Sequence, residues 1–133
     1  MTATRAKLSK MKIIAEIVPV PLARTKINTV NKGRFLTSRS QQFKQDLGFI
    51  ARAAMQGRDI FTGALKLTIN LYRNVKTTAK LFGDADNHAK AVLDACNGIV
   101  FFDDAQIVDL QVIKHYSKIQ YLVIDVEVIE NVD

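Results

Sequence analysis

Acidic side chains gather in two short segments of the chain, Asp84-Ala85-Asp86 and Asp103-Asp104. If Asp84 and Asp86 both lie in extended backbone, their carboxylates share one face of the strand and stand about 7 Å apart. Two like charges at that distance repel each other, so we expect a cation or a proton to neutralise them. The spacing of these acids therefore indicates a site for a divalent cation.

The chain between the two acidic segments predicts how they could meet. Residues 87–97 have the pattern of a helix, which at roughly 1.5 Å per residue is about 15 Å long. Gly98 then supplies a usual stop signal. If residues 99–103 are extended, at about 3.3 Å per residue they cover a similar distance back along the helix. We therefore expect one member of the Asp103-Asp104 pair to return beside Asp86.

Lys90 would stand next to these carboxylates. It follows Asp86 by four residues and projects from the same face of a helix that begins near Asp86. Carboxylate oxygens suit Mg²⁺, which also keeps water and phosphate ligands, and such a cation could promote phosphodiester hydrolysis. Lys90 could neutralise charge on the scissile phosphate or orient the attacking water. In the structural alternative, Asp86 caps the helix, Lys90 forms an exposed pair with it, and Asp103-Asp104 is a turn.

Three neighbouring polar residues could support such a site. The amide of Asn87 could orient a carboxylate or cap the helix, and both roles stay open. Asp94 lies one helical turn beyond Lys90 and could hold that lysine, although an ordinary surface pair is the simpler explanation. Asp103 could ligate the metal in place of Asp104 or beside it.

Two other residues could be mistaken for ligands. His88 lies inside the first segment, but one histidine among carboxylates is a weak signal for a softer metal. Cys96 is the only cysteine, so no intramolecular disulfide can form, and its apolar neighbours favour core packing. The single thiol favours a cytoplasmic location.

Charge is distributed unevenly along the chain. Residues 1–83 carry 16 Lys or Arg and three acids, a balance of +13, whereas residues 84–133 carry three Lys and ten acids, a balance of −7, and the two sum to +6. One half could attract phosphate while the other holds metal, and counterion release would make such binding salt-dependent. A merely soluble basic surface is the alternative. The candidates for DNA backbone contacts are Arg24, Lys26, Lys32, Arg34, Lys76 and Lys80.

Length and periodicity predict one domain of α/β or α+β class, a mixed four- or five-stranded sheet with two main helices. Residues 1–11 are expected to form a flexible basic arm. No apolar run is long enough for a membrane span, and no signal peptide is expected. The last two strands are expected to form a hairpin that turns near Ser117-Lys118. Expected strands cover residues 12–18, 65–72, 107–116 and 119–129, and the first helix starts at a cap, Ser38 or Ser40, and ends near residue 57.

The acidic segments and their surroundings resemble the signature of the RusA family of Holliday-junction resolvases. The resemblance is dense from residue 84 to about residue 114 and looser upstream, and it assigns residues 12–133 to a RusA-like endonuclease domain. It is carried by Asp84-x-Asp86-Asn87-x-x-Lys90, Leu93-Asp94-Ala95, Asn97-Gly98 and Asp103-Asp104-x-Gln106-Ile107-Val108.

This resemblance implies a homodimeric endonuclease, dependent on Mg²⁺ or Mn²⁺, that nicks four-way DNA junctions symmetrically in recombination and repair. The essential carboxylates of the family fall on Asp84, Asp86 and Asp104, and its essential lysine falls on Lys90. Two other classes of function remain. One is a binding protein for branched DNA that has lost catalysis, and the other is a phosphohydrolase of small nucleotides, which the wide basic surface disfavours.

Overall fold

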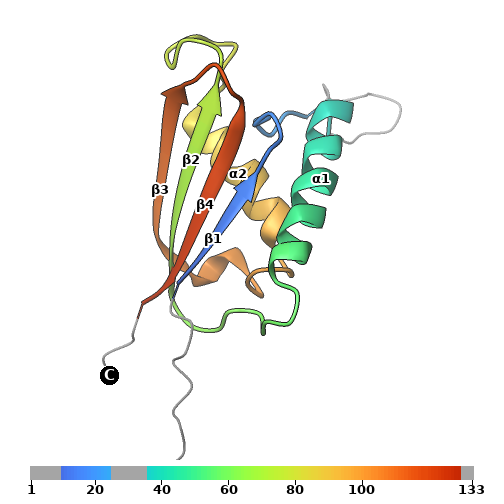
Figure 1. Ribbon diagram of the computed structural model, residues 1–133, viewed down its shortest axis with the longest axis vertical. Helices are drawn as coiled ribbons and strands as arrows, with labels where there is room; N and C mark the ends of the chain where they lie inside the picture. Colours follow the sequence, from blue (N-terminus) through green and yellow to red (C-terminus); the bar gives the residue numbers. More distant parts are fainter. Residues whose placement is uncertain (1–9, 25–35, 130–133) are drawn as a thin grey trace, which may run out of the picture.

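A computed structural model describes residues 10–24 and 36–129, which form one domain with a four-stranded mixed sheet and two helices (Figure 1). The expected α+β class is confirmed. The expected basic arm lies outside the described residues up to residue 9, and Lys10 already belongs to the first strand. The elements in chain order are β1 (Lys10–Ala15), α1 (Ser38–Ala54), β2 (Leu65–Arg73), α2 (Ala85–Cys96), the short 3-10 helix η1 (Asp104–Gln106), β3 (Ile107–Tyr116) and β4 (Tyr121–Val128).

The sheet order is β1-β4-β2-β3, with β2 and β3 parallel and the other neighbours antiparallel. The expected hairpin of the last two strands is therefore wrong, because β2 lies between β3 and β4. The reason is burial. From Tyr121 to Val126, β4 has no exposed residue, which suits a central position, whereas β3 has no buried residue and suits an edge.

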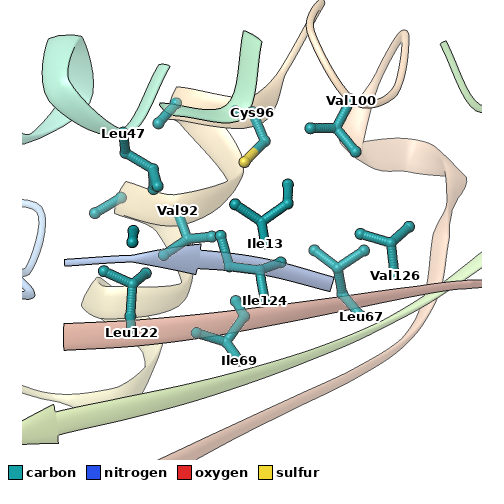
Figure 2. Packing of buried hydrophobic residues seen from close by; sticks show 14 of the residues in the cluster. Ile13, Leu47, Leu67, Ile69, Val92, Cys96, Val100, Leu122, Ile124 and Val126 are labelled. Carbon is teal, nitrogen blue, oxygen red and sulfur yellow. The ribbon is translucent and has the colours of Figure 1, made fainter. Parts of the chain in front are cut away.

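The core fills the space between one face of the sheet and the two helices (Figure 2). The sheet contributes alternate residues such as Ile69 and Ile124, while Leu47 comes from α1 and Val92 from α2. Cys96 is buried among them, as expected, and burial raises the pKa of its thiol to about 12. The thiol therefore stays protonated and unreactive at neutral pH.

Helix α1 also fixes the chain segment that precedes it. The Thr37 side chain caps the helix, rather than either expected serine, by accepting from the backbone N–H of Ser40 at 3.3 Å. The buried Ser40 hydroxyl instead accepts from the Ala23 N–H at 2.9 Å and donates to the Pro21 carbonyl at 3.1 Å. Because the Leu22 N–H donates to the Asn87 carbonyl at 3.0 Å, this segment also lies against the first turn of α2.

Glycines with positive φ mark both ends of α2. Gly98, the expected stop signal, has φ 80° and follows the last helical residues. Gly83 has φ 95° and lies directly before Asp84, in a crowded place. A Cβ at Gly83 would lie 2.7 Å from Pro21 Cγ and 3.0 Å from His88 Nε2, whereas nothing lies within 4 Å of a Cβ at Gly98.

We predict that Gly83→Ala destabilises the fold more than Gly98→Ala. Both variants force an L residue into left-handed backbone, at about 1–2 kcal/mol, but Gly83→Ala adds overpacking of about 1–3 kcal/mol. Urea unfolding of the two variants beside the wild type measures the difference. Equal losses in unfolding free energy would show that the segment around Pro21 does not press on Gly83.

Candidate active site

Two of the predicted site carboxylates lie at the N-terminal end of α2. Asp84 is the N-cap residue, with extended backbone (φ −73°, ψ 143°), and Asp86 lies in the first helical turn. The expectation of an extended backbone therefore fails for Asp86, but both acids are exposed and close in the chain. The Asp84 side chain makes no capping hydrogen bond, so its oxygens remain available. The positive end of the helix dipole favours negative charge here.

The loop before Asp84 is fastened to the sheet through its backbone carbonyls. Arg73, only 8% exposed at the end of β2, donates from one guanidinium nitrogen to the Leu81 carbonyl at 2.8 Å and the Phe82 carbonyl at 3.3 Å. Lys114 of β3 donates from Nζ to the Gly83 carbonyl at 3.1 Å. Sequence reasoning missed both residues as positioning groups. The sequence did offer one sign of this role for Arg73: it is a cation at a position of β2 where the alternation predicts a buried side chain.

The Phe82 side chain fills the space beneath this loop and is fully buried. The Arg73 guanidinium carbon and Lys114 Nζ lie 5.7 Å and 5.2 Å from its ring centroid, which is within the range of cation–π attraction. His88 contacts the ring edge-on at 5.7 Å between centroids. These contacts fix the start of α2 and so fix Asp84.

His88 is a structural residue. It is 1% exposed, and its Nε2 lies 2.6 Å from the Phe82 carbonyl oxygen. Burial lowers the pKa of His88, and the charges of Arg73 and Lys114 lower it further, although the hydrogen bond to Phe82 and the charge of Asp84 oppose this. The imidazole is therefore neutral and is not presented to a metal.

The second acidic segment lies at the other end of α2. Asp104 begins η1, and Asp103 is the N-cap residue of that short helix. A hydrogen bond with the Asp103 side chain raises the pKa of Asp104, burial adds slightly, and the charges of Asp103 and Asp94 raise it further. Asp94, Asp103 and Asp104 therefore form one acidic cluster, here called the acidic end.

One chain does not bring the two acidic segments together. Asp84 and Asp94 are ten residues apart on α2, which at roughly 1.5 Å per residue is about 15 Å. Residues 98–100 form a tight turn, in which the N–H groups of Ile99 and Val100 both donate to the Cys96 carbonyl. The expected extended return toward Asp86 is therefore wrong, because the chain instead turns to bury Phe101. Among residues 10–24 and 36–129, no three Asp, Glu, His or Cys side chains are grouped closely enough to hold an ion.

The remaining site candidates divide between the two ends. Lys90 is exposed one turn beyond Asp86. The ion pairs found among the described residues join Lys12 to Asp125 and Lys66 to Asp109, so the expected contact of Lys90 with Asp94 is not formed.

The predicted DNA contacts are only partly described. Arg24, Lys76 and Lys80 are exposed, the first in the segment that lies against α2 and the others in the loop that ends at Gly83. These three cations therefore lie near the N-terminal end of α2. Together with Lys90 they define what is here called the basic end. Lys26, Lys32 and Arg34 lie outside the described residues.

We predict that acid destabilises the fold through His88. Its pKa falls below the usual 6.5 on folding, so the unfolded chain binds a proton that the folded chain excludes. The stability that neutral His88 contributes is present above that pH and is lost as the pH falls below it. In urea unfolding from pH 7.5 to 5, His88→Gln, which does not titrate, should lose less stability than the wild type. Parallel pH curves would exclude this origin of acid sensitivity.

This chain is similar to a known protein and to a known family. The "Uncharacterized protein YqaN" of Bacillus subtilis (strain 168) is 32% identical to this chain, across 61% of this chain and 68% of its own length. Within the described parts of the chain, neither helix has the length and hydropathy of a membrane span. The family described as "Endodeoxyribonuclease RusA" matches residues 16–127, which is most of the sequence. The chain therefore belongs to the RusA endodeoxyribonuclease family.

Proposed function

We propose that this protein is a divalent-cation-dependent endonuclease that resolves four-way DNA junctions by paired symmetric nicks. Membership of the RusA family supports a nuclease. The observation that carries the proposal is the basic end of α2, where two exposed carboxylates, Asp84 and Asp86, lie among exposed cations. A DNA strand attracted to these cations would pass directly over the carboxylates.

The donor chemistry of the proposed metal site suits Mg²⁺ or Mn²⁺. We assign Asp84, Asp86 and Asp104 as ligands, with Asp103 as the alternative to Asp104, because carboxylate oxygens are preferred by hard cations. When bound, such a cation would polarise the scissile phosphate and lower the pKa of a bound water. Since one chain holds these carboxylates at opposite ends of α2, a set of three would need two copies of the chain. Two symmetric nicks also need two sites, which supports a homodimer.

The other residues would act on the DNA or on the carboxylates. Lys90 would neutralise charge on the scissile phosphate, and the N-terminal end of α2 favours the same anion. Arg24, Lys76 and Lys80, together with Lys26, Lys32 and Arg34, would hold the DNA backbone. Asn87 is not the N-cap residue of α2, so its proposed role is to orient Asp86 or Asp84. Asp94, which does not hold Lys90, adds negative charge beside Asp104.

We predict that Asp86→Asn abolishes junction nicking and leaves junction binding within about threefold of the wild type. Loss of one ligand should cost at least about 100-fold in rate, a magnitude typical for removing a group that stabilises the transition state. Nicking of a labelled four-way junction with Mg²⁺ or Mn²⁺, with and without chelator, measures the rate, and a gel-shift titration measures binding. The matched control is Asp59→Asn, an exposed acid in a loop between α1 and β2.

Cutting that survives in Asp86→Asn or in excess chelator would contradict the proposal. If the wild type binds the junction normally but does not nick it with any divalent cation, the protein is instead a branched-DNA-binding protein.

We also predict that two inactive variants restore each other. Mixed dimers of Asp86→Asn with Asp104→Asn would contain one intact site if each site draws on both copies. About half of randomly assembled dimers are mixed, so nicking should return to about one quarter of the wild-type rate. Mixing Asp84→Asn with Asp86→Asn is the control, because both changes affect the same end of one chain. If the first mixture stays as inactive as the control, each copy must build its site alone.

A further inference from the structure

No strand among residues 10–24 and 36–129 pairs with the outer edge of β3. In the sheet order β1-β4-β2-β3 it is an edge strand, and with ten residues it is the longest strand of the sheet. Natural edge strands are usually short, charged, interrupted by proline or covered, because unpaired backbone groups invite another strand. The strand lacks proline and glycine, and its only Asp, Glu, Lys or Arg residues are Asp109 and Lys114. The other edge strand, β1, has six residues, two of them lysines.

The side chains of β3 leave an apolar surface uncovered beside this edge. Leu110 pairs in register with the buried Leu67 and so faces the helices, yet it is 42% exposed. Val108 is 64% exposed in the same strand, and Phe102 is 62% exposed in the segment just before it. The helix layer therefore covers β3 only in part and leaves apolar side chains exposed in the first half of the strand.

The charges at the two ends of β3 have opposite sign. The acidic end, with Asp94, Asp103 and Asp104, lies where β3 begins. The basic end lies near where β3 finishes, because Lys114 of β3 holds the Gly83 carbonyl. An antiparallel arrangement of two β3 strands would place each acidic end against the basic end of the other copy. A parallel arrangement would bring like charges together, which is unfavourable.

We propose that β3 pairs antiparallel with β3 of a second copy of this chain, joining the two sheets into one sheet of eight strands across a two-fold axis. This inference rests on the homodimer of the proposed function and names its interface. The pairing satisfies the free backbone groups and covers Leu110 and Val108. It also brings Asp104 of each copy toward the end of the partner strand at which Gly83 and Asp84 are held.

Symmetry makes the pairing testable with single cysteines. Directly opposite residues of an antiparallel pair point to the same face. A two-fold axis perpendicular to the sheet must therefore pass midway between one residue of β3 and the same residue of the second copy, so that this residue faces its own copy. Near-complete overlap of the two strands puts that residue at Gln111, Val112 or Ile113. Facing Cα atoms lie about 4.5–5.5 Å apart, within reach of a disulfide.

The experiment oxidises the full chain carrying Gln111→Cys, Val112→Cys or Ile113→Cys, one substitution at a time, at micromolar concentration. We expect one of the three to convert mostly to a reducible covalent dimer. The wild type serves as a blank because Cys96 is buried. The matched control is Ile14→Cys, 56% exposed on the opposite edge strand, which should stay uncrosslinked. Absence of crosslinking in all three, or equal crosslinking at Ile14→Cys, would overturn the interface.

A second measurement does not depend on the register. Leu110→Lys should raise the dimer dissociation constant at least tenfold in sedimentation equilibrium, while Ile14→Lys should not, and circular dichroism should show both variants folded. A wild type that stays monomeric would also overturn the interface. Crosslinking without junction nicking would refute the proposed nuclease and keep the interface. Junction nicking without crosslinking would refute the β3 interface and keep the proposed nuclease.

Discussion

Helix α2 is a rigid spacer between two acidic segments, and the arrangement of the whole candidate site depends on it. Its start is fixed by the loop that Arg73 and Lys114 hold, and its end is fixed by Gly98 and the turn that buries Phe101. A helix of this length cannot bend enough to bring its two ends into contact without breaking backbone hydrogen bonds. The acids at each end of α2 therefore interact with a different set of neighbouring charges.

The two ends tolerate negative charge very differently. At the start of α2 the helix dipole and the surrounding lysines favour Asp84 and Asp86. At its end the dipole opposes acids, the last turn contains no basic residue, and three aspartates repel one another. The pKa of Asp104 is raised, first by its hydrogen bond with the Asp103 side chain and then, to a smaller extent, by burial and by the charges of Asp103 and Asp94. The acidic end thus carries negative charge that a basic partner surface would stabilise.

Sequence patterns predicted the parts of this structure that depend on local rules. Alternating Leu65, Leu67 and Ile69 predicted a strand buried on one face, and Gly98 predicted the end of α2, and both are confirmed. The expected hairpin failed because strand order depends on which strands take the central positions of the sheet, and the spacing of two strands along the chain does not report that. The expected return of residues 99–103 failed for a similar reason, since Phe101 finds its place in the core only through a turn.

The sequence predicted that Asp84 is a site residue, but it did not predict how Asp84 is held in place. The loop before Asp84 is held in part by Lys114, which lies 30 residues later in the chain. Arg73 is buried, and its Nε finds no hydrogen-bond partner in the described part of the chain. Burial, with the charge of Arg39, lowers the pKa of its guanidinium. A cation in such a place is costly, so its hydrogen bonds to Leu81 and Phe82 must offset the lost hydration. In return for this cost in hydration, Arg73 joins the loop before Asp84 to strand β2. Since β2 and β3 together fix Asp84, any assembly through the β3 edge would also fix the distance between the acids of one copy and those of the other.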